Sequence, residues 1–293
     1  MEFRVLQYFL AVTREQSISG AAKALHLSQP TLSRQLKDME EELGKPLFIR
    51  SNRKITLTEE GRILRKRAEE ITELVRKARD EIALSEETIA GDISIGAGET
   101  DGVRCLAKAA RDLQSAYPLV HFHIVSGDKT TVLEDLDKGL IDFALLFGEI
   151  DDSRYDSLKL PCTDAFGVLM RRDDPLAAKD VVTPEDLRDK PLIVSRQSLR
   201  DANLSQLLGC DEEQLNIAAT YNLLFNGSLM VDEGMGYAIS FDKIINVSGD
   251  SSLCFKPLSH RLEISMSLVW KKYPIFTKAA ETFLLYMRER LSG

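Results

Sequence analysis

Apolar residues recur at helical spacing through the first forty residues, which predicts three short helices. The inward face of the first carries Phe3, Leu6, Phe9 and Leu10. Ser17 is placed to cap the second helix, which we expect to end near Leu25. The third begins near Pro30, and its apolar face carries Leu32, Leu36 and Met39.

The stretch from Ser19 to Glu40 predicts two helices joined by a tight turn, a helix-turn-helix. Ala21 and Ala22 have little bulk, so the third helix can approach the second closely. The amide, hydroxyl and cationic groups near the start and on the outer face of the third helix suit base edges and phosphates. This pattern predicts double-stranded DNA as a partner, contacted by Ser28, Gln29, Pro30, Thr31, Ser33, Arg34 and Lys37.

Two short alternating segments follow, 47–50 and 55–57, after a helix stop at Leu43-Gly44. The intervening turn predicts a wing, in which Arg50, Arg53 and Lys54 can grip phosphates or enter a minor groove. The alternative for Arg53 and Lys54 is a solvated turn. We favour DNA contact, because the recognition helix lies just upstream.

A long helix is predicted after Thr58, whose hydroxyl can cap it. Apolar residues recur along it at alternating steps of four and three, the seam of a coiled coil. The seam consists of Leu64, Ala68, Ile71, Val75, Ala78 and Ile82. The amino-terminal helix-turn-helix and wing, which we call the head, are too small to cover so long a helix. We therefore expect the long helix to pair with the same helix of a second copy. Two heads joined in this way would contact two DNA half-sites.

Beyond Gly91 the pattern changes to alternating strands and helices, which predicts a parallel sheet with helices on its faces. The first set comprises strands at 93–97, 121–125 and 143–147 and helices at 103–116 and 131–138. The second comprises strands near 166–170, 192–195, 215–219 and 237–240 and a helix near 223–233. A strand at 262–270 then returns to the first set, and a final helix covers 275–291. Two similar units with the chain crossing between them imply a cleft.

The charge distribution agrees with this division. Residues 1–67 contain 13 Lys+Arg and 8 Asp+Glu, a formal charge of +5, whereas the rest contains 25 and 38, or −13. A basic head on an acidic body keeps the attraction for nucleic acid local to the head. Without an apolar run long enough to cross a bilayer or an export signal, we expect no membrane association and a cytoplasmic protein.

The sequence favours a binding protein over an enzyme. It has no nucleophile elbow, phosphate loop or dinucleotide fingerprint. His121 and His123 share one face of a strand, but no further ligand lies nearby in sequence, so we expect neither a metal nor a cofactor. The four cysteines form no CxxC pair, and we expect no disulfide in a reducing compartment. Two alternatives remain, a DNA-tethered enzyme and an architectural DNA-binding protein without an effector.

Over its whole length the chain resembles the LysR-type transcriptional regulators. The head motifs are Ala21-Ala22, Leu25, Ser28-Gln29-Pro30, Ser33, Leu36, Leu43-Gly44, Leu47-Phe48, Arg50, Thr56-Leu57-Thr58 and Gly61. Those of the body are Gly139-Leu140-Ile141-Asp142, Asp174-Pro175-Leu176, Glu185-Asp186-Leu187 and Glu233-Gly234-Met235-Gly236. One departure is Ser240-Phe241-Asp242, where the family often has a small apolar residue and proline.

The resemblance implies an α/β protein with a winged helix-turn-helix, a coiled-coil linker helix and a periplasmic-binding-protein-like effector domain. We place these parts at 1–58, 59–90 and 91–293, with subdomain one at about 91–160 plus 265–293 and subdomain two at about 161–264. It also implies regulation of promoter binding by a small-molecule effector, and homodimers that often pair into tetramers.

Ligands of open α/β sheets bind beyond the carboxyl ends of the strands, near helix amino termini. The residues at such places here are Glu99, Thr100, Asp101, Asp128, Thr130, Ser195, Arg196 and Asn222. The family resemblance also implies an effector contact at Thr100. The alternatives are helix caps for Thr100, Asp101 and Thr130, and a surface cation for Arg196.

Three carboxylates crowd one side of the expected cleft, those of Glu99, Asp101 and Asp128. An effector with only negative charge would meet them unfavourably. We therefore expect a zwitterionic or amine-bearing effector rather than a simple dicarboxylate.

Overall fold

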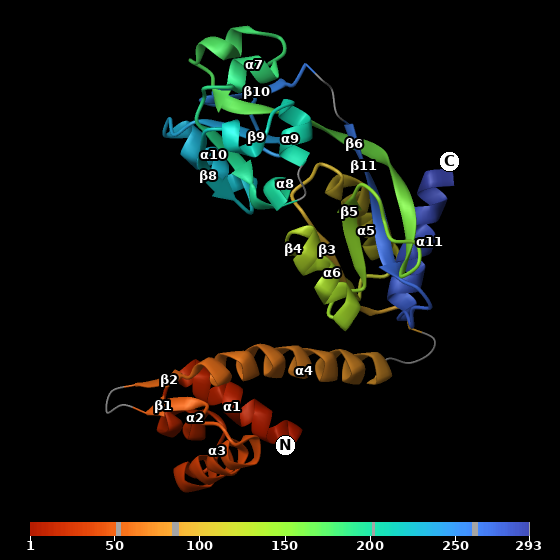
Figure 1. Cartoon of the computed structure of the whole chain (residues 1–293). Coiled ribbons are helices and arrows are strands. Elements are labelled where there is room, and N and C mark those ends of the chain that lie inside the picture. Colours follow the sequence, from red (N-terminus) through yellow and green to blue (C-terminus); the bar gives the residue numbers. More distant parts are fainter. Residues whose placement is uncertain (51–53, 84–87, 201–202, 260–262, 293) are drawn as a thin grey trace. The chain divides into compact units, whose positions relative to one another are not determined.

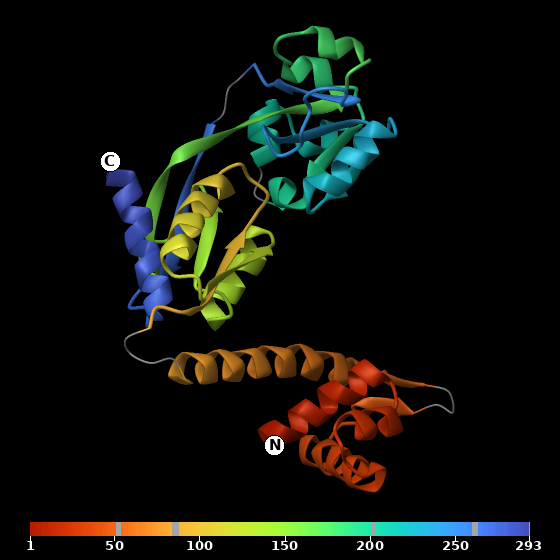
Figure 2. The ribbon, with the colours of Figure 1, turned by 180° about the vertical axis from the view of Figure 1, so that it is seen from behind.

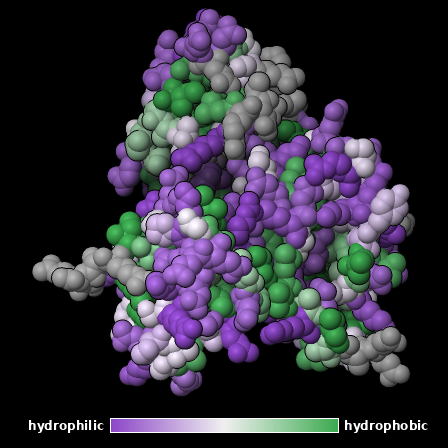
Figure 3. Space-filling model, turned by 60° about the horizontal axis from the view of Figure 1, so that its bottom comes forward, coloured by the Kyte–Doolittle hydropathy of each residue, from purple (hydrophilic) through white to green (hydrophobic). Residues whose placement is uncertain are grey.

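The computed structural model describes residues 1–50, 54–83, 88–200, 203–259 and 263–292. The chain forms two compact units, Met1–Glu86 and Glu87–Gly293. Figure 1 follows the chain through both units, and Figure 3 shows hydrophilic side chains over most of one face, interrupted by smaller hydrophobic patches. No helix in the described ranges is both long enough and apolar enough to cross a membrane.

The first unit is a winged helix-turn-helix followed by a long helix. Its elements are α1 (Phe3–Glu15), α2 (Ile18–Ala24), α3 (Gln29–Leu43), β1 (Phe48–Arg50), β2 (Ile55–Leu57) and α4 (Glu59–Ala83). The expected caps are confirmed: the Ser17 hydroxyl accepts from the Gly20 amide at 3.2 Å, and the Thr58 hydroxyl accepts from the Gly61 amide at 3.0 Å. Gly44 ends α3 in the left-handed conformation, with φ 66°.

The core of this unit joins all four helices to the wing. Phe9, Leu32 and Leu36 are fully buried, and Ala21 and Ala22 lie beside them as the close approach of α2 and α3 requires. Ala68 of α4 is also buried in this core. The first part of the expected seam therefore packs on the head, whereas further along α4 the Ile82 side chain is 85% exposed.

The second unit contains one mixed sheet whose nine described strands have the order β4-β3-β5-β11-β6-β9-β7-β8, with β10 also paired to β6. The expectation of a parallel sheet is right for part of it, because β3 pairs in parallel with β4 and β5. It is wrong for β11 and β6, which are antiparallel to their neighbours because both cross between two halves of the unit.

We call these halves subdomain one and subdomain two. Subdomain one contains β3 (Gly91–Ala97), α5 (Val103–Ala116), β4 (Val120–Ser126), α6 (Lys129–Lys138), β5 (Phe143–Phe147) and α11 (Lys278–Ser292). Helices α5 and α11 contact each other and pack on one face of the sheet, and α6 packs on the other (Figures 1 and 2). Gly139 ends α6 with φ 74°.

Subdomain two contains β7 (Leu192–Ser195), β8 (Ile217–Tyr221), β9 (Tyr237–Phe241), β10 (Leu253–Pro257), the short α7 (Pro184–Leu187), α8 (Arg196–Arg200), α9 (Asn203–Leu208) and α10 (Leu224–Asp232), and the 3-10 turns Pro175–Ala178 and Glu212–Gln214. The strands β6 (Tyr155–Arg171) and β11 (Glu263–Lys271) connect the subdomains. Along β6 the partner changes from β11, up to Ala165, to β9, from Phe166.

Candidate functional site

The third helix of the head presents a polar face to solvent. Its apolar face is buried, and Gln29, Pro30, Thr31, Arg34 and Lys37 are exposed, with Ser33 half-buried. The Ser28 hydroxyl caps the helix by accepting from the Thr31 amide at 3.3 Å, and it shares a hydrogen bond of 2.7 Å with the Thr31 hydroxyl. Both hydroxyls thus order the start of α3 at the surface where DNA contact is expected.

The wing is the antiparallel pair β1–β2, with Phe48 opposite Leu57 and Arg50 opposite Ile55. Arg50 is the last residue of β1 and Lys54 is exposed just before β2, so both flank the tip of the wing. Arg53 lies outside the described residues. The wing expected from the alternating pattern is confirmed.

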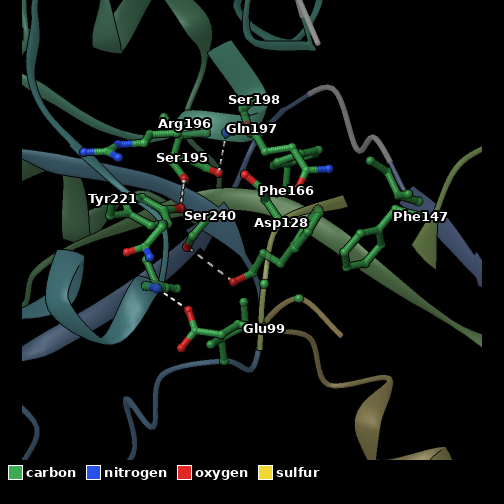
Figure 4. Close-up of a pocket in the computed structure, with 18 residues that line it drawn as sticks. Glu99, Asp128, Phe147, Phe166, Ser195, Arg196, Gln197, Ser198, Tyr221 and Ser240 are labelled. Carbon is green, nitrogen blue, oxygen red and sulfur yellow. Dashed lines mark hydrogen bonds between the residues drawn. The ribbon is translucent and has the colours of Figure 1, made fainter. Parts of the chain in front are cut away.

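In the second unit, a cleft of about 110 Å³ lies between the two subdomains (Figure 4). Five of the expected effector residues line it, namely Glu99, Asp128, Ser195, Arg196 and Asn222. Glu99 and Asp128 belong to subdomain one, and the other three to subdomain two. The strand-end rule therefore identified residues on both walls.

Thr100, Asp101 and Thr130 are not among the residues that line the cleft. The Thr100 hydroxyl donates to Asp164 Oδ2 at 2.5 Å and accepts from the Gly102 amide at 2.9 Å. Asp101 pairs with Arg104, and the Thr130 side chain is exposed.

The cleft also contains three phenylalanine rings, Phe147, Phe166 and Phe241, that were not among the residues expected from the sequence. The Phe241 ring contacts Phe166 at a centroid distance of 4.5 Å and Phe147 at 4.9 Å, with the rings tilted by 40° and 39° respectively. Phe147 ends β5 in subdomain one, and Phe241 ends β9 in subdomain two, so the rings form an apolar contact across the cleft. The segment Ser240-Phe241-Asp242, which departs from the usual family pattern, forms part of this wall. Ser240 and Phe241 both line the cleft, and Asp242 accepts a hydrogen bond from the Ala165 amide at 3.1 Å.

Two hydrogen bonds join the walls. In each, the first backbone amide of a helix in one subdomain donates to a side chain of the other subdomain. The Lys129 amide of α6 donates to Gln197 Oε1 of α8 at 3.3 Å. The Leu224 amide of α10 donates to the Glu99 carboxylate, as Figure 4 shows. Helix amino termini attract such oxygens because their first amides lack partners within the helix. Figure 4 shows Glu99 and Asp128 together at the cleft, and Asp128 also caps α6 through the Thr131 amide at 2.9 Å.

Asp164 lies beside this region, is 1% exposed, and accepts the Thr100 hydroxyl. Burial raises the pKa of Asp164, and the Thr100 hydrogen bond opposes that shift only in part, while the nearby Asp242 charge adds to it. Burial likewise raises the pKa of Tyr221, whose hydroxyl donates to the Ile239 carbonyl at 2.7 Å. Burial therefore disfavours the ionised form of both side chains, and their hydrogen bonds hold them in the cleft wall.

Among the described residues, no group of three or more His, Cys, Asp or Glu side chains is arranged to hold a metal ion. His121 and His123 are exposed on β4, an edge strand, and His123 Nε2 lies 3.5 Å from Asp92 Oδ1. Both histidines therefore lie on the solvated face of an edge strand.

Comparison with known proteins identifies the family of both units. A family model described as the bacterial regulatory helix-turn-helix protein, lysR family, matches residues 3–62, and one described as the LysR substrate binding domain matches residues 86–292. The chain belongs to the LysR family of transcriptional regulators. It is therefore a DNA-binding regulator with an effector domain, and not an enzyme.

Relatives and solved structures agree with this assignment. The HTH-type transcriptional regulator BsdA of Bacillus subtilis (strain 168) is 36% identical over 201 residues, which cover 67% of each chain. The crystal structure of CbnR, a LysR family transcriptional regulator, has 21% identity and a TM-score of 0.76, with 99% of each chain covered. Full-length CbnR complexed with its target DNA has 22% identity, the same TM-score and the same coverage. These structural likenesses show the LysR fold.

Proposed function

We propose that α3 reads the promoter sequence and that the β1–β2 wing holds the DNA backbone. Gln29, Thr31, Ser33 and Arg34 would lie nearest the bases, because they occupy the amino-terminal half of a helix whose other face is buried. Lys37 and the wing cations Arg50, Arg53 and Lys54 would contact phosphates. The protein would act in the cytoplasm, where it meets promoter DNA.

The effector would bind in the cleft between the subdomains. The observation that carries this proposal is the composition of the two walls, which combine polar groups with three phenylalanine rings in one pocket. Such a mixture is typical of small-molecule sites, where apolar walls supply burial and a few polar groups fix orientation. No cofactor is needed for this function.

A zwitterionic or amine-bearing effector with an apolar body fits these walls best. The Glu99 and Asp128 carboxylates can both accept hydrogen bonds from an ammonium group, while the rings contact the apolar part. Arg196 is exposed on the opposite wall and can meet a carboxylate of the same molecule.

Effector binding would control the heads by shifting the subdomains between two arrangements. The hydrogen bonds from Lys129 and Leu224 across the cleft stabilise the arrangement seen here. A ligand that replaces either bond, or adds contacts to it, has different affinities for the two arrangements and shifts their populations. The chain would act as a homodimer paired through α4, with two dimers forming a tetramer, so that the shift changes the spacing of the heads on DNA.

A thermal-shift screen of the full chain would test the effector class. We expect amino acids and amines with apolar side groups to raise Tm and simple dicarboxylates to leave it unchanged. Glu99→Gln and Asp128→Asn should abolish the rise, because each removes a charge while keeping an oxygen for the helix amide. Glu149→Gln, an exposed carboxylate outside the cleft, is the matched control. Stabilisation by dicarboxylates alone would reverse the proposed charge preference.

A further inference from the structure

Two of the four cysteines meet, although 57 positions separate them in sequence. The Sγ atoms of Cys105 and Cys162 lie 3.4 Å apart, and the Cys105 thiol donates a hydrogen bond to Cys162. Both side chains are half-buried, so small molecules in solution can reach them. Cys254 by contrast contacts the Arg171 carbonyl at 3.8 Å.

The backbone beneath Cys162 is irregular. On β6, Thr163 pairs with Ser265 and Lys159 pairs with Ser267, so Leu160, Pro161 and Cys162 together oppose Met266. Such a bulge interrupts the ladder of hydrogen bonds and leaves its residues less constrained than those of a regular strand. Cys105 sits in the first turn of α5.

The two sulfurs are in contact but not bonded. A disulfide needs an S–S distance of about 2.05 Å, so the two sulfurs must approach by roughly 1.4 Å. Rotation of two side chains and a small shift of the bulge can provide that movement.

We propose that Cys105 and Cys162 form a redox-sensitive dithiol, which a small-molecule disulfide converts into an intramolecular disulfide. The Cys105 thiolate attacks one sulfur of the small disulfide, forms a mixed disulfide and releases one thiolate. The Cys162 thiolate then attacks the Cys105 sulfur and releases the second. The two thiol protons go to the released thiolates, so the dithiol loses two electrons and one disulfide becomes two thiols.

The surroundings of Cys162 make ring closure depend on pH. Burial raises the pKa of Cys162 to about 12, with further contributions from the Cys105 hydrogen bond and from the Cys105, Asp164 and Asp101 charges. Cys162 is therefore mainly protonated at neutral pH, which slows ring closure. Below that pKa, closure should accelerate about tenfold for each unit of pH, as the thiolate fraction does.

The disulfide would join α5 to β6, and residues close in sequence to each cysteine line the cleft. The segment before α5 contains Glu99, whose carboxylate binds the Leu224 amide, and β6 continues from Cys162 to Phe166 in the cleft wall. In a reducing compartment the pair stays as thiols, and oxidising conditions would close it.

The full chain carrying Cys210→Ser and Cys254→Ser isolates this pair. We expect oxidised glutathione at pH 9 to remove both alkylatable thiols, with no glutathione retained in the intact mass and a linked peptide containing Cys105 and Cys162. At pH 7 the mass of a mixed disulfide should accumulate before closure. Adding Cys162→Ser should stop the reaction at that mixed disulfide.

Three results would overturn the proposal: two free thiols after long exposure at pH 9, a mixed disulfide that never closes, or a disulfide between two copies on a non-reducing gel. Circular dichroism and the fluorescence of Trp270 confirm that each variant is folded. Guanidinium-unfolded protein serves as the reference, and at equilibrium with the same glutathione buffer the native chain should hold a larger fraction of the closed disulfide than the unfolded chain, because folding holds the two sulfurs 3.4 Å apart.

Discussion

At the scale of single residues, the cations of α3 are already partnered on their own helix. Arg34 lies 3.9 Å from Asp38, and Lys37 lies 3.2 Å from Glu41, each pair one turn apart. Exposed pairs of this kind contribute little to stability, so either cation can exchange its partner for DNA at small cost.

Replacing Arg34 with alanine should separate base contact from phosphate contact. If Arg34 binds a base through two hydrogen bonds, Arg34→Ala costs about 1–3 kcal/mol on the target sequence and relaxes sequence choice at one position. Binding of the variant to the target and to scrambled duplexes at fixed salt measures this. Arg111→Ala removes an exposed cation from the other unit as a control. Equal weakening on every duplex would instead assign Arg34 to the phosphates.

Asp164 should make the second unit less stable as pH rises. Its raised pKa means that the folded state holds the proton more tightly than the unfolded state, whose value is near 3.8. The contribution of Asp164 to stability is thus fully present below that value, and is lost as pH rises through the higher folded value. The Asp164→Asn variant should gain stability over the parent across that window.

Denaturant unfolding followed through Trp270 at several pH values measures this difference. Trp270 is the one tryptophan of the sequence and lies in the second unit, so it reports that unit alone. Asp152→Asn, at an exposed position, is the control. A difference between Asp164→Asn and the parent that does not change with pH would contradict the assignment.

Of the residues that line the cleft, the charged ones could be predicted from the sequence and the phenylalanines could not. Glu99, Asp128 and Arg196 were found because they follow strands, at the sheet edge where ligands of α/β proteins bind. The phenylalanines were missed because an apolar residue at the end of a strand is usually core. The Cys105–Cys162 contact was missed for a different reason, since no local spacing indicates a pair formed by tertiary packing.

At the scale of elements, the locally encoded segments were predicted best. The helices and wing of the head follow from caps and periodicity, and β5 and β7 have their expected bounds. The first half of β6 was missed, because Asp156, Lys159 and Pro161 are typical of a loop. That segment is extended because β11, a hundred residues later, pairs with it. β10 was also missed, and it ends in Pro257, which a strand tolerates only at its edge or end.

Two glycines of the head, Gly44 at the end of α3 and Gly20 within α2, should respond oppositely to replacement by alanine. Gly44 has φ 66°, so Gly44→Ala should destabilise the head by about 1 kcal/mol. Gly20 lies within α2, where an added Cβ would meet nothing closer than 3.4 Å, so Gly20→Ala should stabilise the head by about 0.5–1 kcal/mol. Circular dichroism during denaturation should show the opposite shifts, while the Trp270 transition stays unchanged. A shift of the same sign in both variants would contradict this account.

The exposed part of α4 should determine oligomeric state. Ile82 is 85% exposed, and burying it in both copies of a dimer would contribute several kcal/mol. We expect Ile82→Ser to weaken dimerisation by at least about tenfold in sedimentation equilibrium. Lys66→Ser changes an exposed residue on the opposite side of the same helix and should have no such effect. If Ile82→Ser associates as tightly as the parent, the dimer must use another surface.

At the scale of the whole molecule, the proposed regulation requires that the cleft and the heads share one equilibrium. Thermodynamic linkage then fixes a quantitative relation: an effector that changes DNA affinity by some factor must itself bind with an affinity changed by that factor when DNA is present. Calorimetric titration of an amine identified by the thermal-shift screen, with and without promoter DNA, gives one ratio. DNA titration with and without the amine gives the other.

The two ratios should agree for the parent chain. Glu99→Gln should lower the affinity for the amine, because it removes a charge from the cleft, while DNA binding without the amine persists because the head is intact. If the amine changes the DNA affinity of the Glu99→Gln chain by the same factor and at the same concentration as in the parent, control must act outside this cleft. An amine that binds the cleft and leaves both ratios at one would show a ligand site without a regulatory role.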